Sequence, residues 1–221
     1  MPDQPILRLE DLNFGYAGRP ALFTGLCFAL APGEQVGLYG PNGCGKTTLL
    51  RLIMGLESAQ SGRVLFHGAP VNDPKSLHRL RCNVGLVLQN SDDQLFSPTV
   101  LEDVAFGPLN LGLNKREAKD RAMETLEGLG LAAFAPRPTQ HLSGGEKKMV
   151  SIASVLAMRP EALLLDEPTA FLDDSSREKI VEILKLQSIA RIIVSHDKDF
   201  LEQTTSARLC IKAGRLEAFS A

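Results

Sequence analysis

The chain has 221 residues, which suits one domain with a sizeable core and an inserted lobe. Its composition, with 44% hydrophobic, 23% charged and 5% aromatic residues, is ordinary for a globular protein, and a formal net charge of −2 argues against a nucleic-acid partner. No apolar run approaches the roughly 18 residues that span a bilayer, and the N-terminus does not resemble a signal peptide. Four scattered cysteines lack metal-ligand or disulfide spacing and predict a reduced, cytosolic compartment.

The first third of the chain predicts β-strands separated by Gly/Pro turns. These predicted strands are residues 6–16, 21–30 and 34–40 and a short strand from Arg63. Continuous apolar runs, typical of strands buried on both faces of a parallel sheet, recur later in the chain. They span residues 84–89, 162–168 and 191–197.

Between Thr99 and Pro160 the pattern becomes helical. Thr99 and Glu102 form a T-x-x-E capping box ahead of apolar residues. Residues 114–130 predict an amphipathic helix that ends at glycine, and a further helix begins at Ser143. The pattern as a whole predicts an α/β fold.

We therefore expect one domain over residues 1–221, built on a mostly parallel sheet. Residues 1–90 and 160–221 would form the core, together with an N-terminal antiparallel β subdomain. Residues from about 91 to 159 would form an inserted helical subdomain.

The segment GPNGCGKTT matches the P-loop pattern G-x-x-x-x-G-K-[ST] between a predicted strand and a predicted helix. Its glycines let backbone N–H groups point at phosphate oxygens, and the helix N-terminus adds positive potential. Lys46 is placed to reach the β- and γ-phosphates, and the Thr47 hydroxyl to ligate magnesium. The predicted nucleotide-binding residues are Gly40, Pro41, Asn42, Gly43, Cys44, Gly45, Lys46, Thr47 and Thr48.

The segment LLLDEPT predicts an apolar strand that delivers Asp166 to its carboxyl end, where the carboxylate can hold magnesium through water. Glu167, the next residue, can orient or deprotonate an attacking water. An acidic turn after a strand is common in itself. Beside a P-loop, it indicates nucleotide hydrolysis.

A second glycine motif, LSGGEKKMV, begins at Leu142. Ser143 and Glu146 form a capping box, so a well-capped helix is the simpler interpretation. The two glycines between them are not needed for a cap. They expose backbone N–H groups and favour a second phosphate-binding helix end.

Together these motifs resemble the nucleotide-binding subunit of an ATP-binding cassette (ABC) transporter, over essentially the whole chain and in the family's order. The matching segments are the P-loop at Gly40–Thr47, the Q-loop glutamine Gln89, the signature at Leu142–Glu146, the carboxylates Asp166 and Glu167, the D-loop at Leu172–Asp173 and the switch histidine His196. The resemblance implies a P-loop NTPase core of the ABC type and an ATP hydrolase that uses ATP and Mg²⁺. The implied catalytic residues are Lys46, Gln89, Glu167 and His196, and the implied magnesium ligands are Thr47, Gln89 and Asp166.

The resemblance also implies a head-to-tail dimer that sandwiches two ATP molecules, formed by two copies or with a paralogous ATPase. The chain ends soon after the last predicted hairpin, which leaves dimerisation without ATP open. The residues implied to contact the partner's ATP are Ser143, Gly144, Gly145, Glu146 and Asp173. Tyr16 matches the family's adenine-stacking aromatic, although a tyrosine at a strand end can instead pack on the core.

Several residues depart from the family pattern. Glu146 stands where Gln is usual, Met149 where a basic residue is usual, and Phe171 replaces a small residue beside the D-loop. Phe171 could alter how two subunits touch. Because the catalytic residues are retained, we expect an active ATPase.

Cys44 lies inside the P-loop, near Lys46 and the start of a helix. This environment favours a reactive thiolate that a maleimide would modify and MgATP would protect. A buried, inert thiol is the alternative.

The segment QNSDDQLFSPTVLEDVAFGP resembles the ATPases of energy-coupling factor importers, including the cobalt and nickel uptake ATPases and those serving vitamin uptake, with Ser91 in place of a usual proline. This implies a peripheral subunit on the cytoplasmic face of the membrane, bound to a membrane-embedded coupling subunit that works with a substrate-capturing membrane protein. Transition-metal uptake is the leading substrate hypothesis. A soluble ABC ATPase of repair or translation, or the ATPase of another ABC transporter class, remains an alternative.

Leu95 and Phe96 stand together in this segment, in a predicted loop. They either dock the membrane partner or pack between the two subdomains.

Overall fold

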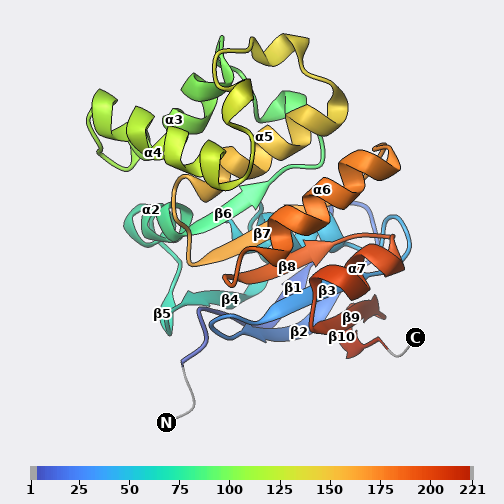
Figure 1. Cartoon of the computed structure of the whole chain (residues 1–221). Helices are drawn as coiled ribbons and strands as arrows, with labels where there is room; N and C mark the ends of the chain where they lie inside the picture. The colour runs from blue at the N-terminus through green and yellow to red at the C-terminus, as the bar shows by residue number, and fades with distance from the viewer. Residues whose placement is uncertain (1–3, 220–221) are drawn as a thin grey trace.

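Two β-sheets form the lower part of the molecule in Figure 1, and a group of helices lies above them. The figure shows a computed structural model, which describes residues 4–219. The ends of the predicted domain, residues 1–3 and 220–221, lie outside the described part of the chain. The α/β prediction is confirmed.

The larger sheet has six strands in the order β10-β9-β3-β8-β7-β6, which run parallel from β9 to β6, while β10 pairs antiparallel with β9. Its strands are β3 (Gln35–Tyr39), β6 (Val84–Val87), β7 (Ala162–Asp166), β8 (Ala190–Val194), β9 (Ala207–Lys212) and β10 (Arg215–Ala218). Strand β7 shows why the sequence has continuous apolar runs, since its side chains are buried on both faces of the sheet. Leu163 and Leu165 join the apolar cluster on one face of the sheet, while Leu164 joins the cluster on the other.

The smaller sheet is antiparallel, in the order β2-β1-β4-β5, as the sequence predicts for the N-terminal part. Its strands are β1 (Leu7–Phe14), β2 (Phe23–Leu30), β4 (Ser61–Phe66) and β5 (Ala69–Pro70). Buried side chains of β1 pack with those of the larger sheet and the helix after the P-loop in one apolar cluster. This packing holds the two sheets together.

The helices above the sheets in Figure 1 are those between β6 and β7. They are η1 (Ser91–Asp93), α3 (Val100–Asn110), α4 (Lys115–Gly128), η2 (Ala132–Phe134), η3 (Thr139–His141) and α5 (Gly144–Leu156). The three longer helices each begin with a reciprocal capping box, formed by Thr99 and Glu102, by Asn114 and Glu117, and by Ser143 and Glu146. The starts predicted at Thr99 and Ser143 are confirmed.

The remaining helices lie against the larger sheet. They are α1 (Lys46–Ile53), α2 (Pro74–Asn83), α6 (Asp174–Lys185) and α7 (Lys198–Thr204). Helix α2 escaped the sequence analysis because Leu80 is its one fully buried residue, so it carries little apolar periodicity. None of the described helices is both long and apolar enough to cross a bilayer.

The parallel strands point the same way, so the segments that follow them meet along one edge of the sheet. The P-loop follows β3, Gln89 lies just beyond β6, Glu167 follows β7 and His196 lies just beyond β8. The topology thus gathers motifs that lie far apart in the sequence.

Candidate functional site

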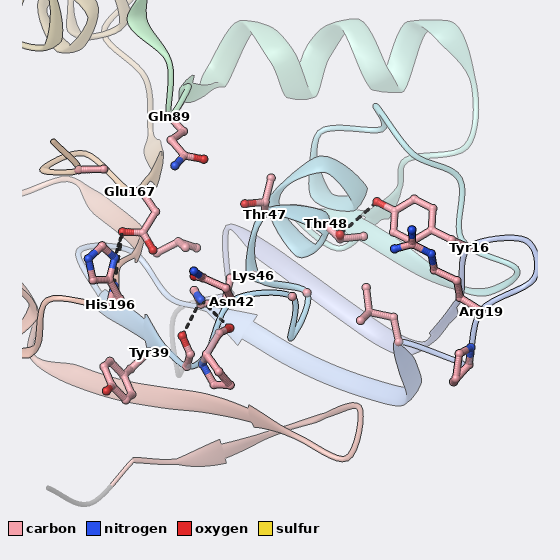
Figure 2. Close-up of a pocket in the computed structure, with 18 of the residues that line it drawn as sticks. Tyr16, Arg19, Tyr39, Asn42, Lys46, Thr47, Thr48, Gln89, Glu167 and His196 are labelled. Carbon is pink, nitrogen blue, oxygen red and sulfur yellow. Dashed lines mark hydrogen bonds and ion pairs between the residues drawn. The ribbon is translucent and has the colours of Figure 1, made fainter. Parts of the chain in front are cut away.

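A cleft of about 1130 Å³ opens along this edge (Figure 2). It is lined by Tyr16, Arg19, Pro20, Ala21, Leu22, Tyr39, Gly40, Pro41, Asn42, Gly43, Gly45, Lys46, Thr47, Thr48, Gln89, Glu167, Ala170, Phe171, Val194 and His196. All four predicted catalytic residues line the cleft, as do most of the predicted nucleotide-binding residues. The volume suits a nucleotide-sized ligand.

The P-loop wraps around the amine of Lys46. The Nζ donates to the carbonyl oxygens of Gly40 at 2.6 Å and Pro41 at 3.1 Å, and the side chain is buried. Gly45, the N-cap of α1, has a φ of 106°, and a Cβ there would lie 2.8 Å from the ring of Phe23. Glycine is therefore required at this position both for the backbone angle and for the close packing. The result is a positive charge and free helix N–H groups facing one cavity.

Thr47 and Asp166 meet beside the P-loop, where the Thr47 hydroxyl donates to the Asp166 carboxylate at 2.9 Å. Burial raises the pKa of Asp166, although the bond from Thr47 opposes that rise. Gln89 lines a smaller cleft together with these two residues. The described residues contain no cluster of three or more His, Cys, Asp or Glu able to hold a metal alone. Hydroxyl, carboxylate and amide oxygens beside a phosphate pocket fit Mg²⁺, which usually keeps waters and phosphate oxygens as ligands.

Glu167 and His196 form a pair across neighbouring strand ends, with Glu167 Oε2 and His196 Nδ1 2.9 Å apart (Figure 2). The Glu167 N–H donates to the Val194 carbonyl at 2.9 Å, which extends the pairing of β7 with β8 by one residue. Sheet register therefore fixes this pair. The Glu167 side chain is 10% exposed and that of His196 is 66% exposed, so the imidazole forms the solvent-facing side of the pair.

Tyr16 lies at the opposite end of the cleft from Glu167 and His196, next to Arg19 (Figure 2). Its hydroxyl is 3.1 Å from the Thr48 hydroxyl, and its ring packs edge-to-face against Phe14 at 5.0 Å between centroids. The ring is nevertheless 38% exposed in the cleft. Both interpretations of Tyr16 are thus partly met, and adenine stacking stays a prediction.

The predicted partner-contact residues lie outside the residues that line this cleft. Glu146 accepts a hydrogen bond from the Ser143 N–H at 2.7 Å. Two further hydrogen bonds from Arg137, at 2.7 and 3.2 Å, lower the pKa of Glu146 to about 2. A Cβ at Gly145 would collide with Ser176 of α6, whereas one at Gly144 would meet open space. Gly145 is therefore needed for packing inside the chain, while Gly144 is free to face another molecule.

Asp173 caps helix α6 by accepting from the Ser176 N–H at 2.8 Å. The hydroxyl of Ser175 and the Ser176 N–H lower the pKa of Asp173 to about 2. The carboxylate is therefore ionised and held at a surface turn.

Cys44 does not line the cleft, although both of its neighbours in the P-loop do. It is half-buried and packs against the apolar cluster beneath the P-loop. A Cβ on Gly40 would lie 3.0 Å from its sulfur. This placement favours the inert-thiol alternative.

Side chains that the sequence analysis missed tie Gln89 to the signature helix α5. The Lys148 Nζ donates to the carbonyls of Leu88 at 2.8 Å and Gln89 at 2.6 Å. Gln94 accepts from the Leu88 N–H at 3.0 Å and donates to the Ser151 carbonyl at 2.8 Å. Burial lowers the pKa of Lys148 to about 8. These contacts, hereafter the Q-loop clamp, bind the end of β6 to α5.

Leu95 and Phe96 have different environments. Leu95 is half-buried and packs against the apolar cluster under the helices. Phe96 is 64% exposed and meets Phe106 edge-to-face at 4.7 Å. The packing interpretation therefore fits Leu95, and the docking interpretation fits Phe96.

A P-loop, a buried aspartate and a glutamate–histidine pair at adjacent strand ends, beside a helical subdomain, define an ATP-binding cassette ATPase. The family model described as ABC transporter matches residues 23–170, and the chain belongs to this family. It is therefore an ATP-binding, ATP-hydrolysing subunit of a transporter.

Two curated relatives are ATP-binding proteins named for energy coupling and for cobalt import. The chain is 48% identical to the energy-coupling factor transporter ATP-binding protein EcfA of Methanocaldococcus jannaschii, over 89% of this chain and 72% of that protein. It is 43% identical to the cobalt import ATP-binding protein CbiO of Rhodobacter capsulatus, over 97% of this chain and 78% of that protein.

Two solved structures share the fold. The CbiO1 protein of Clostridium perfringens, part of the CbiONQ transporter complex, superposes with a TM-score of 0.86 at 36% identity, covering 97% of this chain and 88% of that one. A dimeric bacterial ABC transporter cassette superposes with a TM-score of 0.83 at 26% identity, covering 97% and 99%. These findings confirm the predicted fold.

Proposed function

We propose that this chain is the ATPase subunit of an energy-coupling factor importer that drives transmembrane uptake of a transition metal ion, cobalt or nickel, or of a vitamin. The observation that carries the proposal is the segment from Gln89 to Pro108, which joins the cleft to an exposed aromatic pair, together with the relatives named for energy coupling and cobalt import. The subunit would sit at the cytoplasmic face of the membrane, bound to a membrane-embedded coupling subunit and its substrate-capturing partner.

The P-loop binds the phosphates of ATP in this proposal. Lys46 exchanges its bonds to the Gly40 and Pro41 carbonyls for the β- and γ-phosphate oxygens, because a phosphate offers a stronger charge-assisted bond. The adenine lies at the Tyr16 end of the cleft. Thr47, Asp166 and Gln89 would hold Mg²⁺, which would supply charge neutralisation at the phosphates when bound.

Glu167 orients and deprotonates the attacking water. Its Oε2 is paired with His196 Nδ1, which leaves Oε1 to accept the proton, and the imidazole would turn away from Oε2 to reach the γ-phosphate. The exposure of His196 allows this turn, and the burial of Glu167 holds the base in place.

A second copy, or a paralogous ATPase, completes the site by presenting its signature helix. The partner's glycines would offer backbone N–H groups to the γ-phosphate, a role for which Gly144 has open space around it. Asp173 lies at the same interface. The dimeric form of the related cassette supports this arrangement.

The chemistry is tested by replacing Glu167 with glutamine. E167Q should bind ATP, form a stable dimer in size-exclusion chromatography and release almost no phosphate. The chain offers a matched control in Glu161, which pairs with His67 at 2.7 Å at the opposite end of β7. E161Q should hydrolyse ATP at the wild-type rate. Phosphate release from E167Q close to that of E161Q would remove Glu167 from its assigned role.

The membrane partner is tested at Phe96 and Leu95. F96D should leave the ATPase rate of the isolated subunit unchanged but prevent co-purification with a multi-spanning membrane protein. L95D should instead lower the melting temperature, because it places a charge against the apolar cluster. Loss of ATPase activity in folded F96D would contradict docking, and a wild-type chain that captures no membrane protein would favour a soluble ATPase.

A further inference from the structure

Phe171 is held outward in a strained conformation. Its side chain is 100% exposed, and its φ of 61° lies in the left-handed region that bulky residues rarely adopt. Backbone hydrogen bonds and apolar packing hold the surrounding turn in place. The Ala170 N–H donates to the Glu167 backbone carbonyl at 3.2 Å, the Leu172 N–H donates to the Thr169 carbonyl at 3.3 Å, and Leu172 packs on the core. A strained backbone conformation that the surrounding contacts enforce in this way points to a functional role.

Phe171 stands on the border of two clefts. It lines the nucleotide cleft beside Glu167 and His196. It also lines a neighbouring cleft of about 280 Å³ with Gly144 and Lys147, at the start of the signature helix. The ring therefore lies between the phosphate side and the signature side of the same chain.

We propose that Phe171 contacts a second copy of this chain and becomes buried when two copies close over ATP. The inference rests on the proposed function, in which the partner covers both the P-loop and the signature helix. Because Phe171 borders both surfaces, closure moves its ring from water into the interface. A two-fold interface contains the ring twice, so each closure buries two aromatic side chains.

Replacement of Phe171 by glycine should therefore change the stability of the monomer and the affinity of the dimer in opposite directions. F171G should raise the melting temperature of the monomer, because glycine accepts the positive φ without strain. The same variant should weaken the ATP-bound dimer by at least about tenfold in Kd, because the buried ring is lost. F171A removes the ring but keeps the strain, so it should weaken the dimer without the rise in melting temperature.

The measurement is sedimentation of each variant in the E167Q background with ATP, alongside thermal melting without ATP. Ala213 gives a control for backbone strain, since it has a φ of 46° in the turn before β10. A213G should raise the melting temperature and leave the dimer unchanged. Leu186 gives a control for apolar exposure, since it is 70% exposed and lines neither cleft. L186A should leave the dimer unchanged.

An F171G dimer as tight as its E167Q parent would overturn the inference and leave the proposed function standing. Weaker binding of a fluorescent ATP analogue to monomeric F171G, with dimerisation intact, would also overturn it, because the ring would then serve its own cleft. Failure of the E167Q parent to dimerise with ATP would overturn both the inference and the proposed homodimer.

Discussion

Replacing Lys148 with methionine should lower both the stability and the turnover of the enzyme. The substitution keeps the apolar stem but removes the ammonium that donates to the carbonyls of Leu88 and Gln89. Gln89 then loses its attachment to α5 just where its amide faces the cleft. We therefore expect a fall in kcat with a smaller change in KM, because binding by the P-loop is untouched.

The size of the stability loss follows from the contacts. Two charge-assisted hydrogen bonds contribute about 1.5–3 kcal/mol each. Burial opposes them, since it lowers the pKa of Lys148 from 10.5 to about 8, which corresponds to roughly 3 kcal/mol against the charged amine. The variant also leaves two backbone carbonyls without this donor, although exposed Gln89 can turn to water. We expect a net loss of about 2 kcal/mol, or about 4–8 °C in Tm for a chain of this length.

The neighbouring lysine is the control. Lys147 pairs with Asp92 at 2.6 Å, but the Asp92 side chain is 67% exposed, so K147M should cost at most about 1 kcal/mol. Urea unfolding and steady-state ATPase assays compare the two variants. Equal stability and equal kcat in K147M and K148M would refute the reasoning.

The pH dependence of unfolding gives a second check on Lys148. Its folded pKa is lowered, so between pH 8 and 10.5 the unfolded state binds more protons than the folded state. The wild-type free energy of unfolding therefore gains a contribution that rises with pH in this window, and K148M lacks it. A stability difference between the two proteins that stays constant from pH 8 to 10.5 would mean that Lys148 is not buried as a cation.

Much of the site is predictable from sequence because several of its motifs follow the end of a strand, and parallel strands bring their ends together. The P-loop and Glu167 are examples. The Q-loop clamp is not predictable in this way, because Lys148 lies 59 residues from Gln89 and nothing local indicates the contact. The strain at Phe171 is also hidden, since only the folded turn sets its positive φ. Asp73 and Pro74 are typical of a helix start at α2, but the mostly polar residues that follow lack the apolar periodicity that predicts a helix.

Two further predictions concern single side chains. Maleimide should modify exposed Cys27 and leave half-buried Cys44 unmodified in the folded protein, with or without MgATP; mass spectrometry that finds an ATP-protected adduct on Cys44 would contradict its placement. The stability difference between wild type and R137M should be full above pH 4.5 and disappear as the pH falls to about 2, because Arg137 pairs only with ionised Glu146. A difference that does not change in acid urea titrations would contradict that pairing.

The Q-loop clamp suggests how transport and hydrolysis are linked in the proposed function. The backbone carbonyl of Gln89 is hydrogen-bonded to Lys148 of α5, whereas Lys46 and Glu167 lie in segments that follow strands β3 and β7 of the sheet. A displacement of the helices relative to the sheet would therefore shift Gln89 relative to Lys46 and Glu167. Phe96 follows Gln94 of the clamp by two residues, and its N–H is held by Asp103 of α3. A membrane partner bound at Phe96 would thus act on the helices and, through the clamp, on Gln89, a predicted magnesium ligand.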